Sequence, residues 1–371
     1  GVLTSVHAFA SDPGRGVFIL VLFLVAVIGS LGLFAWRAPA LKMGSRFAPI
    51  SREGSLLLNN FLLSVATAAV LLGTLYPLFL DVVAGQKISV GAPFFNAVFV
   101  PIMIPMIVLM AIGPFLRWKR GDIAGIMDRL QIMFFATIAA VLATWWLLTG
   151  GSIGVALGLG LATWLAVGTL VEYADRIKLF RTGLADSLRR ARKLPLAAYG
   201  MTISHLGVAV LVAGIAGASA WQGEKIQMMG INDKVSLAGY DFTLTDVSQI
   251  KGPNYTASRA SFLVEKGGKE VMQLYPERRI YVNKARPTTE AAIRTLWFND
   301  LYVVIGEADE TNRWVTRIYY RPLVSLIWAG ILIMALAAVV SIADRRSRIG
   351  VPVRAARRPR VPQGAAPVAE V

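Results

Sequence analysis

The sequence predicts an α-helical polytopic membrane protein with an inserted β-rich extracytoplasmic domain. The membrane assignment rests on composition, because 56% of the 371 residues are hydrophobic and only 16% are charged. An ordinary soluble domain contains roughly 25% charged residues. The β-rich domain is expected at residues 222–322, where mixed charges and short β-branched and aromatic runs replace the long apolar runs.

Seven apolar runs are long enough to cross a bilayer. A helix that rises about 1.5 Å per residue needs about 20 apolar residues to span the hydrocarbon core. We therefore expect a six-helix membrane domain at residues 17–221 and a last transmembrane helix at 323–343. The runs are residues 17–36, 56–80, 97–116, 131–149, 153–171, 199–221 and 323–343.

The run at 97–116 is unusual because it contains Pro101 and Pro105, with Pro114 near its end. Proline removes a backbone hydrogen bond, so this helix is expected to kink or break. Membrane proteins tolerate this where protein or a cavity satisfies the backbone. The segment is either a packing kink or one wall of a cofactor or substrate cavity.

Lys and Arg residues are concentrated in the loops after alternate spans and in the tail. Because cytoplasmic loops carry the excess of basic residues, the N-terminus is placed outside and the C-terminus in the cytoplasm. The β-rich domain is then extracytoplasmic, in a multi-pass membrane protein. This distribution explains the net charge of +16, so no nucleic-acid partner is predicted. The basic segments are residues 37–52, 117–129, 176–193 and 345–360.

The extracytoplasmic segment, residues 222–322, is expected to form a small antiparallel sheet or barrel. Gly252-Pro-Asn and Gly267-Gly268 mark turns between its short runs. The expected strands are residues 240–247, 260–266, 270–275, 278–282, 301–307 and 314–320.

The two ends of the chain differ in composition and in expected location. Residues 1–16 form an external segment, and residues 344–371 form a basic cytoplasmic tail that is expected to be disordered, because it has little to bury. The chain begins with Gly1 and shows no signal-type segment, so it is expected to be part of a larger protein.

Cysteine is absent from the sequence. The chain therefore offers no disulfide, thiolate metal ligand or cysteine nucleophile. Any thiol chemistry must use the thiols of another molecule.

His205 is one of two histidines in the sequence and lies inside an apolar run. By helical rise it is about 9 Å above the cytoplasmic end of that run and about 24 Å below the outer end. Ionisable groups at such depth are functional candidates, and a neutral imidazole can ligate haem iron. The alternative is a helix-to-helix hydrogen bond, which the small neighbours Ser204, Gly207 and Ala209 would favour.

His7, the second histidine, lies in the external segment about ten residues before the first span. A single loop histidine is most often solvated. If both histidines bind iron, their different depths imply two sites, and each site needs a further ligand from elsewhere.

Short motifs in a fixed order run along nearly the whole chain, and together they resemble the C-terminal half of the CcmF family. This family is the haem lyase component of cytochrome c maturation. The motifs include Ser5-Val-His-Ala-Phe-Ala, Leu72-Gly-Thr-Leu-Tyr-Pro, Phe95-Asn-Ala-Val-Phe-Val-Pro, His205-Leu-Gly-Val-Ala-Val, Tyr275-Pro-Glu-Arg-Arg, Asp300-Leu-Tyr and Trp328-Ala-Gly.

The resemblance implies that His205 is an axial ligand of a membrane haem b and that His7 is an external haem ligand. Haem would arrive on holo-CcmE, and CcmH-type subunits would present the thiols of apocytochrome c. The family's Trp-Trp-Asp segment and other ligand histidines would lie before Gly1. The chain alone is therefore expected to be an inactive part of a haem lyase complex, and no catalytic residue is assigned.

Three other functions remain open at this point. A membrane transporter with an external sensor domain would suit a proline-containing span and a buried histidine, but it predicts inverted repeats, which the sequence does not show. A structural scaffold predicts that His205 can be replaced without loss of a cofactor. A nitrite-reductase maturation homologue of the same family is the third.

Overall fold

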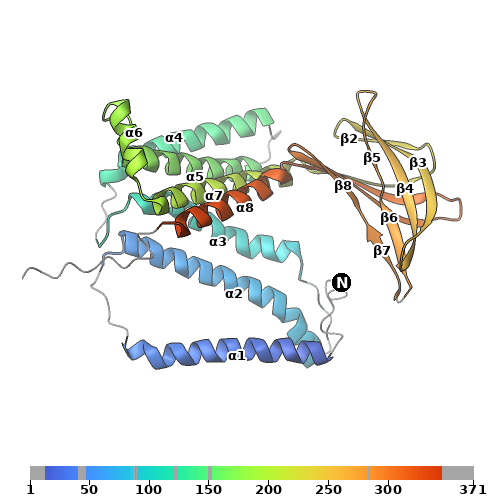
Figure 1. Ribbon diagram of the computed structural model, residues 1–371, viewed down its shortest axis with the longest axis horizontal. Helices are drawn as coiled ribbons and strands as arrows, with labels where there is room; N and C mark the ends of the chain where they lie inside the picture. Colours follow the sequence, from blue (N-terminus) through green and yellow to red (C-terminus); the bar gives the residue numbers. More distant parts are fainter. Residues whose placement is uncertain are drawn as a thin grey trace, which may run out of the picture.

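The structure, a computed structural model, describes residues 13–40, 47–84, 86, 88, 90–119, 124–148, 153–282 and 284–344. A body of helices carries a β-rich body at one end (Figure 1). Seven helices in these ranges are long and apolar enough to cross a membrane. The expected fold class is therefore confirmed. His7 and residues 345–371 lie outside the described residues.

The long helices lie roughly along one direction in Figure 1, and large apolar side chains cover much of their outer surface. Such a surface suits lipid, not water. Short helices occur at Ala38–Ala40, Gly113–Phe115 and Ala124–Ile126, and a π-helical turn at Thr144–Leu148. The long helices are α1 Pro13–Arg37, α2 Arg52–Ala84, α3 Ala92–Ile112, α4 Met127–Ala143, α5 Ile153–Ile177, α7 Leu196–Ala220 and α8 Val324–Ile342.

Helices α3, α4, α5 and α7 share the core of the membrane body. Met133 of α4 and Leu165 of α5 are fully buried, and Met106 of α3 and Ala209 of α7 pack in the same cluster. The proline-containing helix α3 therefore lies against the helix that carries His205.

Helix α3 runs without a break from Ala92 to Ile112 through Pro101 and Pro105. The break in this helix that the prolines suggested is therefore not present. Each proline deprives only one carbonyl of its usual donor, and membrane helices accommodate this by local adjustment and by packing against neighbours. Pro114 lies in the short helix Gly113–Phe115 that follows.

Helices α7 and α8 approach each other at glycines. A Cβ atom on Gly330 would lie 2.7 Å from the backbone oxygen of Gly207 and 2.7 Å from the backbone nitrogen of Leu211. Contacts this short leave no room for a side chain. Small residues at such positions allow the close backbone approach on which membrane helix pairs depend.

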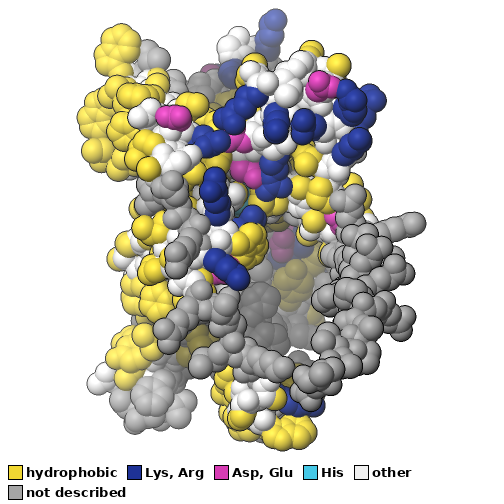
Figure 2. Space-filling model, turned by 90° about the vertical axis from the view of Figure 1, so that its left-hand side faces the viewer, with side chains coloured by type: hydrophobic (Ala, Val, Ile, Leu, Met, Phe, Trp, Pro, Cys, Tyr) yellow, Lys and Arg dark blue, Asp and Glu magenta, His cyan; other side chains and the backbone are white. Residues whose placement is uncertain are grey.

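A short amphipathic helix, α6 Leu184–Lys193, crosses the end of the bundle between α5 and α7 (Figure 1). The sequence predicted this stretch only as part of a basic loop. Leu184 and Leu188 are 69% and 54% exposed, whereas Arg190 lies on another face. Figure 2 looks onto this end and shows Lys and Arg side chains gathered over it.

The β-rich body, called the β domain here, comprises residues 223–322 and contains two antiparallel sheets. One sheet has the strand order β1-β10-β9-β8, and the other has the order β2-β3-β4-β6-β7 with β5 paired to β4. The strands are β1 Gly223–Met229, β2 Lys234–Leu237, β3 Tyr240–Lys251, β4 Tyr255–Lys266, β5 Lys269–Leu274, β6 Glu277–Tyr281, β7 Lys284–Glu290, β8 Ala292–Leu296, β9 Asn299–Ala308 and β10 Trp314–Pro322.

The two sheets enclose an apolar core. Phe242 and Phe262 from one sheet and Leu301, Ile305 and Ile318 from the other are fully buried. Alternate residues of β9 are buried, as expected where one face of a strand meets a core and the other meets water.

The β domain joins the membrane helices through very short links. Trp221 and Gln222 separate α7 from β1, and Leu323 alone separates β10 from α8. Strands β1 and β10 pair directly, with Gly223 opposite Tyr320. The antiparallel pair of helices thus continues into an antiparallel pair of strands.

Candidate functional site

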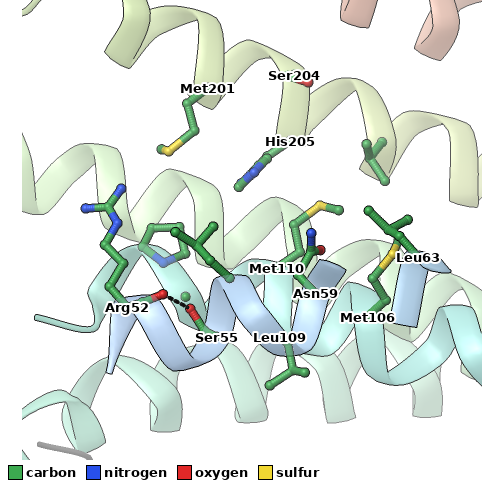
Figure 3. A pocket seen from close by; sticks show the side chains of 14 residues that line it. Arg52, Ser55, Asn59, Leu63, Met106, Leu109, Met110, Met201, Ser204 and His205 are labelled. Carbon is green, nitrogen blue, oxygen red and sulfur yellow. Dashed lines mark hydrogen bonds between the residues drawn. The ribbon is translucent and has the colours of Figure 1, made fainter. Parts of the chain in front are cut away.

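His205 lies about nine residues along α7, which corresponds to about 14 Å from the N-terminal end of that helix. Its side chain points from α7 toward α2 (Figure 3). It lines a cavity of about 470 Å³ between α2, α3 and α7. The structure therefore places the embedded histidine at a cavity.

The walls of this cavity are mostly apolar. Leu63 of α2, Met106 and Leu109 of α3, and Val208 of α7 line it together with His205. A volume of this size falls within the range of about 300–1,000 Å³ that is typical of small-molecule sites. The lining also combines many apolar groups with few polar ones, as such sites do.

The imidazole of His205 makes no hydrogen bond to any residue that the structure describes. The helix-to-helix hydrogen bond considered from the sequence is therefore absent from this part of the chain. Glycine packing between α7 and α8 does not require the imidazole either, since it involves Gly207 and Gly330. The unpaired ring nitrogens are available to a ligand in the cavity.

The polar side of the cavity comes from α2. Arg52, Ser55 and Asn59 lie at spacings of three and four residues and so share one face of the helix. The Ser55 hydroxyl donates to the backbone oxygen of Arg52 at 2.9 Å (Figure 3). The guanidinium of Arg52 lies over the ring of Trp118, 5.1 Å from its centroid.

A cluster of charged residues lies beside this cavity at the basic end of the bundle. Glu172 is only 5% exposed and forms an ion pair with Arg176, one turn further along α5. Asp175 forms ion pairs with Arg129 and Arg181. These residues, except Arg181, line a second cavity of about 320 Å³.

The cluster contacts the histidine cavity through Met201. The Arg176 guanidinium donates to the Met201 sulfur at 3.6 Å, and Met201 lines the same cavity as His205. The Oε2 atom of Glu172 has no hydrogen-bond partner among the described residues. Neither Glu172 nor Asp175 was predicted from the sequence, although two acids directly before a basic segment are a visible signal.

His7 lies outside the described residues, so the structure gives no position for it relative to His205. Among the described residues, no group of three or more His, Cys, Asp and Glu side chains could hold a metal ion.

Residues 220–322 match the family model described as "CcmF C-terminal beta-sandwich". The matched residues are almost the same as those that form the two sheets.

Curated relatives match most of the chain. The chain is 43% identical over 361 residues to "Cytochrome c-type biogenesis protein CycK" of Bradyrhizobium diazoefficiens, covering 97% of this chain and 55% of the relative. It is 42% identical over 354 residues to CcmF of Pseudomonas aeruginosa, covering 95% and 53%. It is 40% identical over 349 residues to CcmF of Escherichia coli, covering 94% and 52%. The chain spans about half the length of these relatives.

A solved structure named "Cytochrome c Heme Lyase CcmF" has a similar fold. The TM-score is 0.66 at 23% sequence identity, and the match covers 89% of this chain and 51% of that chain. The arrangement of helices and β domain is therefore shared with that protein.

Proposed function

We propose, since this chain belongs to the CcmF family of cytochrome c-type biogenesis proteins, that it takes part in cytochrome c maturation as a component of a haem lyase complex. The observation that carries the proposal is sequence identity of 40–43% along nearly the whole chain to proteins with this name. A transporter or a permease with a sensor domain has no comparable support.

We infer that His205 is an axial ligand of a haem b bound in the cavity between α2, α3 and α7. The residues present fit this group. An unpaired imidazole faces a cavity of about 470 Å³, and its walls are largely apolar, as the ring of a haem requires. A haem held there supplies a redox centre. Neutral imidazole is the form that binds metal, and it is also the form that a membrane interior tolerates.

We assign His7 to a separate, external haem site by its resemblance to the family. In this proposal haem is received from holo-CcmE near His7, and CcmH-type subunits present the reduced thiols of apocytochrome c. The covalent step adds these thiols to the haem vinyl groups. Because the chain has no cysteine, it cannot itself form a mixed disulfide with those thiols.

The proposed orientation in the bacterial inner membrane puts the β domain in the periplasm and α6 with the C-terminus on the cytoplasmic side. The distribution of basic residues supports it. His7 and the β domain then lie on the same side of the membrane, where cytochromes c are assembled. The membrane haem lies between that side and the cytoplasm.

The proposal is tested by optical spectra of the full-length protein, oxidised and reduced, for wild type, His205→Ala and His7→Ala. We expect a b-type spectrum that the His205 change weakens strongly. The His7 change should leave that spectrum and reduce cytochrome c maturation. A wild-type protein without haem, or a full spectrum in both variants, would overturn the ligand assignments and favour a scaffold.

A further inference from the structure

The Arg52 side chain has an unusual position at the cytoplasmic end of the His205 cavity. It is half-buried, and it forms no ion pair with any residue in the described ranges. Two carboxylates lie nearby, and the charge of Glu172 reaches Arg52, but neither acid forms an ion pair with it among the described residues. Glu53 accepts a hydrogen bond from the backbone N–H of Lys119 at 2.7 Å, and Glu172 pairs with Arg176.

An unpaired guanidinium at the edge of a membrane is costly, because a buried charge normally needs a partner of opposite sign. The contact between Arg52 and the ring of Trp118 offsets only part of this cost, since a cation over an aromatic face contributes little where water reaches it. Because Glu172 forms its ion pair with Arg176, the Arg52 end of the cavity stays positive and can accept an anionic group.

The same face of α2 extends this polar end into the cavity. Ser55 lies one turn from Arg52, and Asn59 lies one further turn along, at the height of Met110 in Figure 3. The side chains of Arg52 and Asn59 carry several hydrogen-bond donors, whereas the single Ser55 donor is used on the backbone oxygen of Arg52. Beyond them the lining becomes apolar at Leu63.

We propose that Arg52 binds the propionate carboxylates of the haem whose iron His205 holds, an inference that rests on the proposed haem site. Arg52 would thus fix the haem with its acidic edge toward the cytoplasm. The two propionates leave one edge of an otherwise apolar ring. The cavity has the matching arrangement, with Arg52 at one end, apolar walls at the other and the imidazole between them (Figure 3). The planar guanidinium can donate two parallel hydrogen bonds to a carboxylate.

A structural role for Arg52 is the rival explanation. Its long side chain could simply extend to lipid headgroups while the Trp118 ring holds it in place. Both roles predict that removing Arg52 perturbs the protein. Only carboxylate binding predicts that the effect depends on whether the haem carries free propionates.

The test compares haem with its dimethyl ester, which has the same iron and ring but no carboxylate charge. Haem-free full-length protein is titrated with each compound, and binding is followed by the Soret band. We expect wild type to bind haem roughly 10- to 100-fold more tightly than the ester, the range for hydrogen bonds to a charged group. Arg52→Gln should bind both compounds with similar affinity, close to that of the wild type for the ester. Arg52→Lys should restore part of the preference.

Arg117→Gln is the matched control. Arg117 is an exposed arginine at the same end of the bundle, and it lines the second cavity but not the His205 cavity. It should keep the wild-type preference for haem.

The outcomes separate this inference from the proposed function. If Arg52→Gln keeps the wild-type preference, or if its affinity falls equally for both compounds, Arg52 does not act on the carboxylates and the inference is wrong. The haem site itself would still stand if His205→Ala weakens the b-type spectrum. If His205→Ala binds both compounds as wild type does, the proposed haem site is wrong.

Discussion

Glu277, in strand β6, shows how single residues stabilise the β domain. Its side chain is 7% exposed and forms ion pairs with both Arg259 and Arg279. Burial raises the pKa of the Glu277 carboxyl, but hydrogen bonds from Arg279 and Arg259 outweigh it and hold the pKa below its usual range. A carboxylate with a lowered pKa stabilises the fold above its unfolded pKa, and this stabilisation is lost as pH falls through the folded pKa.

We predict that Glu277→Gln lowers the free energy of unfolding of the β domain at pH 7 by about 1.5–3 kcal/mol, because hydrogen bonds to charged groups are lost. The difference from wild type should shrink in acid, once pH falls below the ordinary glutamate pKa of about 4.3 and the wild-type carboxylate also becomes protonated. Thermal unfolding followed by near-ultraviolet circular dichroism at pH 7 and in acid measures both effects.

Glu307→Gln is the control, since Glu307 is 76% exposed in its ion pair with Arg278. Exposed pairs contribute about 0–1 kcal/mol. A loss in Glu277→Gln that is equally large at both pH values would contradict the electrostatic explanation.

At the scale of residues, the sequence identified His205 but not its surroundings. An isolated histidine in an apolar run is visible without a structure, because depth follows from helical rise. Arg52 was read only as one charge of a cytoplasmic loop. Its position beside His205 arises from packing between α2 and α7, which lie far apart in the sequence, so no local pattern encodes it.

At the scale of elements, the pair α7 and α8 depends on glycine. We predict that Gly330→Ala destabilises the protein by about 1–3 kcal/mol, the usual cost of overpacking. The added methyl group would meet the backbone of Gly207 and Leu211 at 2.7 Å, and backbone cannot move aside as a side chain can. Thermal unfolding in detergent, followed by circular dichroism at a helix band, measures the change.

Gly154→Ala provides the comparison within the same bundle. A Cβ atom there would meet no heavy atom within 4 Å, so this variant should be neutral or slightly more stable, since alanine is the better helix former. Equal losses of stability in the two variants would show that glycine flexibility matters and close packing does not.

Helix α6 is predicted to lie in the membrane surface, with its leucines toward lipid. Because the chain has no cysteine, single labels can be introduced at Leu188→Cys and Arg190→Cys. These positions are two residues apart and point to opposite sides of the helix. In lipid bilayers, a spin label at 188 should be more accessible to oxygen and one at 190 to a water-soluble nickel complex. Equal accessibility to the nickel complex would place α6 in water.

The strands that the sequence missed are all edge strands. Strands β1 and β8 bound one sheet, and β2 and β7 bound the other. An edge strand pairs on one side only, and it can carry residues that a central strand excludes, such as Pro287 in β7. The inner strands β3, β4, β9 and β10 were predicted because burial on the core face requires apolar residues there.

At the scale of the whole molecule, the orientation in the membrane can be tested by introducing single cysteines, since this chain has none of its own. Lys269→Cys lies in the β domain and Lys193→Cys at the end of α6, and both positions are exposed. A membrane-impermeant thiol reagent should label position 269 in cells whose outer membrane is permeabilised. It should label position 193 only after the inner membrane is opened. The reverse pattern would invert the proposed topology.

The insertion of the β domain between α7 and α8 also has a consequence for synthesis. At about 5–20 residues per second, the roughly 100 residues between these helices take about 5–20 s to make. During that time α7 is in the bilayer without α8. The pairing of β1 with β10 brings the two ends of the inserted domain together. Folding of the domain must therefore offset the entropic cost of closing this long loop. Until α8 follows, the face of α7 that packs against α8, including a further cavity that the two helices share at His205, has no partner helix.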